Sequence, residues 1–423
     1  MPQLAEQQDT YQTAFDAFRR EPAFGAGAEA DARTAAFDRF LARGYPTTRD
    51  EAWRHTSIAP IAALSFERAA AAVPDAAALA AVGFDGVSHV AVIVNGRLSE
   101  KLSSLAGLPT GVSVTSAPVG AVPEVADLNV FVDLNSAFAE HAIVVDVAPK
   151  VVVEAPLHLA FVTVPGRTPA LVSPRLVVRA GDGAQVTIIE SYTDLGAGVT
   201  FTNVVADIHA APSAFVDHVK LERQSSEAFH QATTIVRTGR GGTFRSHNVT
   251  LGGRIARNDI ISVLEGEGAE CTLNGLYVAT GEALVDNHTT IDHAKAHCPS
   301  HEVYKGILSG HARAVFNGKI VVRPDAQKTD AKQTNKALLL TDDAQINTKP
   351  QLEIFADDVK CTHGAAIGQL DEDALFYLQA RGISLAAART MLIHAFAGDV
   401  LNGIRTASVR DAAMRLVETQ LSI

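Results

Sequence analysis

The spacing of hydrophobic residues changes twice along the chain and divides it into three regions. Between about residues 8 and 43 apolar side chains recur at the spacing of amphipathic helices. Gly44 and the following Tyr45-Pro46 supply helix-ending and turn chemistry, because proline cannot extend a helix. The sequence therefore predicts an N-terminal helical region. Its periodic apolar positions are Tyr11, Phe15, Phe18, Phe37, Phe40 and Leu41.

Between about residues 87 and 367 the pattern changes to short segments rich in Val, Ile, Thr and Phe, which are typical of β-strands. Gly-rich turns recur close to segments that contain Asn203, Asn248, Asn274 and Asn317, and these positions are about 45, 26 and 43 residues apart. We interpret this spacing as a repeat of roughly 22 to 26 residues with degenerate copies. That period favours a parallel β-helix, in which each coil buries its apolar face by stacking on its neighbours.

The competing architecture for this region is one or two β-sandwiches. Asn-Gly and Asp-Gly pairs are strong signals for hairpins, and hairpins belong to antiparallel sheets. Periodicity alone leaves both architectures open. The pairs are Asn95-Gly96, Asp182-Gly183, Asn274-Gly275 and Asn317-Gly318.

Helical spacing returns after about residue 371, and Gly382 marks a stop between two helices. The second helix, residues 386–401, carries an apolar stripe. A stripe of this kind is either core or a docking surface at the end of the chain, and both interpretations stay open. The stripe comprises Ala388, Met391, Leu392, Ala395, Phe396 and Val400.

The length of the chain favours an elongated repeat fold, because 423 residues are too many for one ordinary compact core. We expect a helical domain over residues 1–86, a β-helix over residues 87–367 and a helical domain over residues 368–423. The C-terminal helices are expected to cap the open end of the β-helix, where unpaired backbone is otherwise exposed.

Composition and charge exclude several classes of function. Hydrophobic residues make up 47% of the chain, yet no uninterrupted apolar run is long enough to cross a bilayer. The polar, acidic N-terminus carries no export signal, so we expect a cytoplasmic protein that does not bind membranes. A net charge of -11 argues against nucleic-acid binding. The sequence contains neither a Walker A loop nor a G-x-S-x-G elbow, and we expect no enzymatic activity.

Cys361 and His363 form the first possible ligand set. Residues two apart in an extended segment point to the same side, so a thiol and an imidazole here can reach one soft metal such as iron. Two ligands do not complete a site, because an iron–sulfur cluster takes four. The pair is therefore either half of a site that another chain completes or a buried cysteine beside a structural histidine.

The densest group of possible ligands lies between residues 288 and 301. His288, His293 and Cys298 are weaker metal candidates within it. The spacing matches neither the H-E-x-x-H nor the C-x-x-C pattern, and scattered polar residues are also typical of the solvated face of a solenoid.

Four stretches in the same order resemble the SufB/SufD family of the SUF iron–sulfur cluster assembly system, and they span most of the chain. Where SufB-type members carry a Glu-His-Glu-Ala type sequence, this chain has Cys361-Thr362-His363-Gly364-Ala365, which is similar to the SufD-type members. The stretches are residues 44–56 (GYPTTRDEAWRHT), 287–293 (NHTTIDH) with 304–306 (YKG), 358–365 (DVKCTHGA) and 375–383 (LFYLQARGI).

The resemblance implies a right-handed parallel β-helix flanked by helical domains, and a scaffold role in cluster assembly. It implies pairing with SufB through the β-helix, or a homodimer when the chain is alone, and binding of a SufC ATPase through the C-terminal helices. The nascent iron–sulfur cluster is expected to form transiently at the SufB interface, with no cofactor held stably by this chain.

The resemblance also implies roles for particular residues. His363 is expected to be the residue most closely tied to the cluster, with Cys361 as its neighbour. Closure of two SufC subunits on ATP would pull on the C-terminal helices and shift the SufB interface. The residues expected to dock SufC are Met391, Leu392, Ala395, Phe396 and Val400.

Two rival functions belong to other classes. A β-helix enzyme that acts on polysaccharide would line a groove with aromatic residues, but this chain has one Trp and 6% aromatic residues. The other rival is a purely structural partner whose His363 takes no part in ligand binding.

Overall fold

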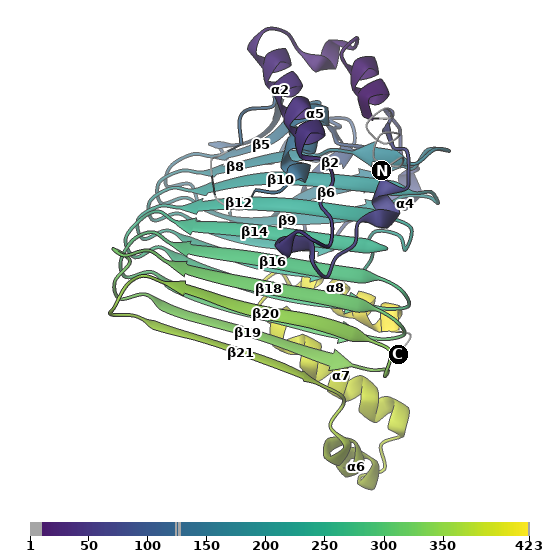
Figure 1. Cartoon of the computed structure of the whole chain (residues 1–423), viewed down its shortest axis with the longest axis vertical. Helices are drawn as coiled ribbons and strands as arrows, with labels where there is room; N and C mark the ends of the chain where they lie inside the picture. The colour runs from purple at the N-terminus through teal and green to yellow at the C-terminus, as the bar shows by residue number, and fades with distance from the viewer. Residues whose placement is uncertain (1–10, 123–124, 126–127, 422–423) are drawn as a thin grey trace.

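Two long β-sheets run the length of the molecule, and the chain crosses from one to the other in every coil (Figure 1). The computed structural model describes residues 11–122, 125 and 128–421. It is mainly β, a parallel β-solenoid of about eight turns with helices at both ends of the chain. The parallel β-helix is therefore confirmed and the β-sandwich is wrong.

We call the two sheets sheet A and sheet B. Short strands β1 (Glu67–Arg68) and β7 (Ala170–Val172) join the edge of sheet A. The other strands of sheet A are β4 (Val112–Ala117), β5 (Ala142–Val147), β8 (Arg175–Ala180), β10 (Thr200–Ala210), β12 (Phe229–Thr238), β14 (Ile255–Leu264), β16 (Leu284–His293), β18 (Arg313–Val322) and β20 (Gln345–Ile354). The strands of sheet B are β2 (His89–Val94), β3 (Arg97–Leu98), β6 (Leu157–Thr163), β9 (Gln185–Asp194), β11 (Phe215–Glu222), β13 (Thr243–Thr250), β15 (Glu270–Ala279), β17 (Pro299–Leu308), β19 (Asp330–Leu339) and β21 (Lys360–Gly368).

The strand register shows that the repeat is longer than the sequence spacing indicated. Phe229 pairs with Ile255, 26 residues on, and Arg313 pairs with Gln345, 32 residues on. The expected 22 to 26 residues meets the observed 26 to 32 only at its upper limit, because a coil needs two strands of up to ten or eleven residues and two turns. The Asn positions mark no single column, since Asn203 and Asn317 lie in sheet A whereas Asn248 and Asn274 lie in sheet B.

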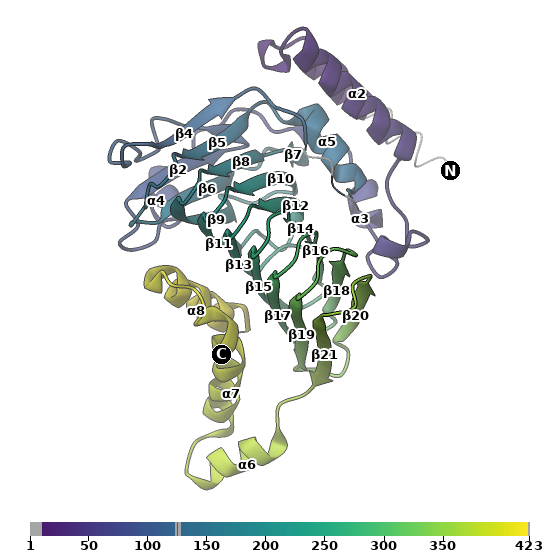
Figure 2. The same cartoon turned by 90° about the vertical axis from the view of Figure 1, so that its left-hand side faces the viewer.

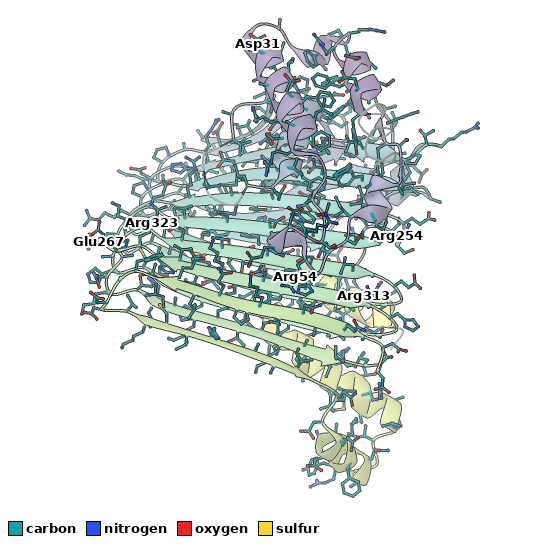
Figure 3. All side chains as sticks on the ribbon, viewed as in Figure 1. Asp31, Arg54, Arg254, Glu267, Arg313 and Arg323 are labelled. Carbon is teal, nitrogen blue, oxygen red and sulfur yellow. The ribbon has the colours of Figure 1, made fainter. Side chains whose placement is uncertain are left out.

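The turns that lead from sheet A to sheet B stack on one another. Gly183, Ser213 and Gly241 occupy equivalent positions with φ of 67°, 59° and 60°. The backbone N–H of Gly183 donates to the carbonyl of Pro212 one coil on (2.9 Å), and that of Ser213 donates to Arg240 (2.9 Å). Charged side chains fan out along the turns at both edges of the solenoid (Figure 3). Asp182-Gly183 therefore makes a solenoid turn, whereas Asn95-Gly96 does join β2 to β3 as a hairpin.

Helices and an aromatic cluster cover the outer face of sheet A near its N-terminal end (Figure 2). Residues 11–18 are helical, and the ring of Phe15 stacks on Phe37 with centroids 4.0 Å apart. Phe138 packs against the same cluster. Gly44 ends the second helix with φ of 64°, as the sequence predicts. The N-terminal elements are η1 (Pro22–Phe24), α2 (Ala28–Arg43), η2 (Glu51–Trp53), α3 (Ala59–Ala62) and α4 (Ala76–Ala80), and α5 (Val130–Phe138) follows from within the solenoid.

The C-terminal helices α6 (Glu372–Ala380), α7 (Leu385–Leu401) and α8 (Ala407–Leu421) do not cap the solenoid. Ile393, Val400 and Val409 pack with buried residues on the outer face of sheet B, and Figure 2 shows α7 and α8 beside that face. The last strand, β21, is exposed along most of its length. The expected cap is therefore wrong, because the apolar stripe of α7 finds a larger apolar surface on the side of the sheet. None of the described helices is long and apolar enough to span a bilayer.

Two glycines inside the solenoid leave room for tyrosine rings. A Cβ added to Gly275 would lie 2.2 Å from the Tyr304 ring, and one added to Gly306 would lie 2.2 Å from the Tyr277 ring. We expect Gly275→Ala to destabilise the protein by about 1–3 kcal/mol, because the ring cannot move within the packed core. Thermal unfolding followed by circular dichroism measures the effect. The matched control is Gly368→Ala, whose Cβ would meet nothing within 4 Å, and equal melting temperatures for the two variants would contradict the prediction.

Candidate functional site

The C-terminal end of the solenoid is open and carries the first possible ligand set. Cys361 and His363 lie on β21 and pair with Ala331 and Gln333 of β19. Paired residues of parallel strands face the same side, and Ala331 and Gln333 are buried inside the solenoid. Both candidate side chains therefore face the mouth of the lumen, which confirms that they share one side of an extended strand.

The environments of the two side chains differ. Cys361 is half-buried, and this burial raises the pKa of its thiol, whereas His363 is exposed. A metal ion that replaces the thiol proton stabilises the thiolate, so it can bind Cys361 despite the raised pKa. Across the described residues, no three His, Cys, Asp or Glu side chains are placed to hold a metal ion, so the pair remains an incomplete set.

A buried polar column lies beneath this mouth and was missed by the sequence reasoning. Gln333 and Glu302 point inward in line with His363. Gln333 lies one coil below His363, and Glu302 lies one coil below Gln333. The Gln333 amide nitrogen donates to Glu302 Oε2 at 2.7 Å. Burial raises the pKa of Glu302 to about 7, although hydrogen bonds from Thr289 and Gln333 act in the opposite direction. Knowledge of the strand register would have revealed the column, but register is not visible in the sequence.

A second buried polar cluster lies deeper in the lumen. His218 bonds to Glu190 (2.8 Å), and the Lys220 ammonium contacts His230 (2.9 Å) and donates to Asn258 (2.6 Å). Burial lowers the pKa of Lys220 to about 8. These charges compensate one another, so we assign the cluster a structural role.

The structure does not bring His288, His293 and Cys298 together. His293 points into the lumen and hydrogen-bonds Ser300 at 3.0 Å. Cys298 is buried at a turn, where its thiol donates to the carbonyls of Gly266 and Ala296. His288 lies on the opposite, outer face of sheet A. Three separate environments argue against a shared metal site.

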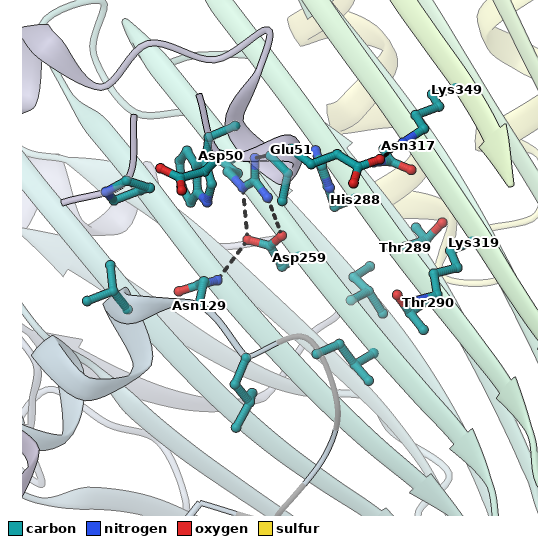
Figure 4. Close-up of a pocket in the computed structure, with 18 of the residues that line it drawn as sticks. Asp50, Glu51, Asn129, Asp259, His288, Thr289, Thr290, Asn317, Lys319 and Lys349 are labelled. Atoms are coloured by element: carbon teal, nitrogen blue, oxygen red, sulfur yellow. Dashed lines mark hydrogen bonds and ion pairs between the residues drawn. The ribbon is translucent and has the colours of Figure 1, made fainter. Parts of the chain in front are cut away.

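His288 does line a cleft between sheet A and the N-terminal segment (Figure 4). Its Nε2 lies 3.0 Å from Asp286, which also accepts hydrogen bonds from Thr56 (2.6 Å) and Arg257 (2.6 Å). Burial by itself would raise the pKa of Asp286, but the charges of Arg257 and His288 hold it at about 2. The Arg257 guanidinium stacks on the Trp53 ring at 3.8 Å.

The cleft has a volume of about 580 Å³ and joins two of the family-like stretches, residues 44–56 and 287–293. Glu51 of the first stretch pairs with Lys349 of β20 at 2.5 Å. The N-terminal segment therefore forms a strap across sheet A from β14 to the last coil. We define the strap as residues 44–56.

The residues expected to dock an ATPase fall on different sides of α7. Met391 and Ala395 are exposed, and Leu392 and Phe396 are half-buried. Val400 is buried against sheet B and is not available to a partner. The docking role of the four accessible residues stays a prediction.

Comparison with known proteins assigns the family. The model of the SufBD N-terminal region matches residues 7–159, and that of the SUF system FeS cluster assembly SufBD core domain matches residues 162–396. The chain belongs to the SufB/SufD family.

Several curated relatives of this SufB/SufD-family chain match over most of its length. It is 35% identical to an iron–sulfur cluster assembly SufBD family protein of Synechocystis, over 86% of this chain and 85% of the relative. It is 32% identical to the iron–sulfur cluster assembly protein SufD of Escherichia coli, over 90% of each chain. A Bacillus subtilis SufD is 27% identical over 69% of this chain and 68% of the relative.

The buried Glu302 predicts an unusual dependence of stability on pH. Its pKa of about 7 lies above that of an unfolded Glu, so the folded state holds the proton more tightly, and burial of the carboxylate costs stability as the pH rises from about 4.5 to 7. We expect Glu302→Gln to be more stable than the wild type at pH 8, by on the order of 3 kcal/mol, with the difference vanishing towards pH 4. Melting temperatures across that range test this, and parallel curves for the two proteins would refute it.

Proposed function

We propose that this chain is a scaffold subunit of a SUF cluster assembly complex, which pairs with SufB through the open end of its solenoid. The observation that carries the proposal is the exposed last coil. Strand edges that are neither paired nor covered are templates for pairing with another chain. Here β20 and β21 end the two sheets side by side. The apolar side chains of Ile354, Phe355 and Ile367 are exposed around them.

The same surface presents the incomplete ligand set. Cys361 offers a soft sulfur and His363 an imidazole, and both donor types bind iron. A cluster needs more ligands than these two, and a partner strand added to β21 would place its own side chains beside them. Iron and sulfide are the cargo of this site, built at the interface and passed on.

A second surface fits the SufC ATPase. Helix α6 and the start of α7 expose large apolar side chains, with Phe376 73% and Met391 49% exposed. Tyr377 and Leu385 are further exposed apolar residues of the same two helices. Soluble monomers rarely expose such a patch without a partner, and the patch lies at the end of the chain that family resemblance assigns to SufC.

One contact links the two surfaces. The Lys305 ammonium on β17 donates to the carbonyl of Phe396 (3.0 Å), pairs with Asp399 and lies 4.4 Å from the Phe396 ring. Strand β17 is separated from β21 by β19 alone. A shift of α7 when two ATPase subunits close would therefore act on the coils next to the SufB interface, and the interface would change its ligand geometry as a two-state element.

The first prediction of this proposal concerns His363. We expect His363→Ala to lower cluster formation on the purified complex with SufB and SufC by at least about tenfold, because a ligand is lost, while the complex still assembles. Iron and sulfide content and the visible absorbance of the cluster give the yield, and size exclusion gives the assembly state. The control is His301→Ala, an exposed histidine on the outer face of β17. A normal cluster yield from His363→Ala would contradict the assignment of His363 as a ligand.

The second prediction concerns the docking patch. We expect Met391→Asp to weaken SufC binding about 100-fold, since a charge placed in an apolar contact costs roughly 3 kcal/mol. Co-purification and calorimetry measure the binding. Val152→Asp is the matched control, because Val152 is a comparably exposed apolar residue that lies outside α6 and α7. Unchanged binding by Met391→Asp would mean that SufC binds at another surface.

A further inference from the structure

An unpaired acceptor lies directly beneath the mouth of the solenoid. Gln333 is 2% exposed, and its amide nitrogen is bonded to Glu302, itself 1% exposed. The carbonyl oxygen of the Gln333 amide has no hydrogen-bond partner within the part of the chain that the structure describes. A buried acceptor without a donor costs about 1–3 kcal/mol, so its presence requires an explanation.

The strand register places one donor beside this oxygen. Gln333 of β19 pairs with His363 of β21, and paired residues of parallel strands project to the same side about 4.8 Å apart. The two side chains therefore project to the same side of sheet B. No hydrogen bond joins them in the structure, and a rotation of the exposed His363 side chain would bring a ring N–H to the Gln333 carbonyl oxygen. No hydrogen bond of the His363 ring is present within the described residues, so a possible donor and a free acceptor lie on paired positions of neighbouring strands.

Glu302 determines which end of the amide remains free. At pH 8, above the pKa of Glu302, its carboxylate only accepts hydrogen bonds, so it holds the NH₂ group of Gln333 and leaves the carbonyl oxygen for another donor. The opposite wall accommodates this arrangement. A Cβ on Gly318 would lie 2.2 Å from the Gln333 amide nitrogen, so a glycine is needed there for the amide to occupy its place.

We propose that Gln333 is a positioning residue for His363. The Gln333 carbonyl oxygen accepts a hydrogen bond from one ring N–H of His363, which fixes the tautomer and leaves the other ring nitrogen unprotonated and facing out of the mouth. Histidines that bind metals almost always donate their second ring N–H to a carboxylate or carbonyl in this way. With this hydrogen bond made, the existing contact between Glu302 and Gln333 would extend through His363 to the surface.

The use of this column for iron rests on the proposed function, but the hydrogen bond itself does not. It therefore has a test in the isolated chain, without partner or metal. In protein labelled with ¹⁵N-histidine, nuclear magnetic resonance detects a ring N–H when a hydrogen bond protects its proton from exchange with water. The resonance of His363 is assigned by its loss in His363→Ala.

We expect a protected ring N–H of His363 in the wild type at pH 8 and its loss in Gln333→Met. The exchange variant E302Q/Q333E restores the signal, because the amide and the carboxylate swap places and an acceptor again lies under the ring. His293, whose Nε2 bonds to Ser300, serves as the internal control for an intact lumen and keeps its resonance in every variant.

A protected His363 N–H that survives in Gln333→Met, or one that is absent from the wild type, overturns the positioning role. Cluster yield in the complex separates the two claims. A normal yield from His363→Ala removes the proposed function and leaves the hydrogen bond standing. A tenfold loss of yield in His363→Ala, with no effect of Gln333→Met on the ring signal, removes the positioning role and leaves the proposed function.

Discussion

The structure depends on the stacking of one coil on the next. Each coil buries its inward side chains and satisfies its backbone only through neighbours, as in the pairing of β18 with β16 on one side and β20 on the other. The same rule decides what fills the lumen. A side chain that is too large for its column must be matched by a gap, and Gly275 and Gly306 supply such gaps for Tyr304 and Tyr277. Stacking therefore accounts both for the stability of the central coils and for the unpaired strand edges of the last coil.

The two ends of the solenoid differ in how their outermost strands are covered. At the N-terminal end, antiparallel pairing of β4 with β5 and of β3 with β2 closes the sheets, and α5 with the aromatic cluster covers sheet A. At the C-terminal end nothing in the described chain covers β21, because α7 and α8 lie against the side of sheet B. The chain itself covers one end, and within the described residues the other end stays exposed, which is the surface proposed above for a partner.

The sequence predicts the fold class well and the site in part. Strand texture and helical spacing locate the three regions, and Gly44 and Gly382 end helices where expected, because these signals are local. The two-residue spacing of Cys361 and His363 is likewise local, and the structure confirms their shared side. The repeat length, the Gln333 column and the burial of Val400 could not be predicted, since each depends on which strands become neighbours. Asn-Gly pairs show the limit: Asn95-Gly96 forms a hairpin, whereas Asn274-Gly275 lies within a strand.

The strap has a consequence for how the molecule is made. Its Glu51 leaves the ribosome almost 300 residues before Lys349, the partner that it holds on the last coil of sheet A. Until then the segment rests on Arg257 and Asp286, which arrive coil by coil as synthesis proceeds. The ion pair with Lys349 can form only once β20, the last strand of sheet A, has been made, while β21 and the C-terminal helices still follow. The strap therefore completes its contacts across sheet A only when the last strand of that sheet is in place.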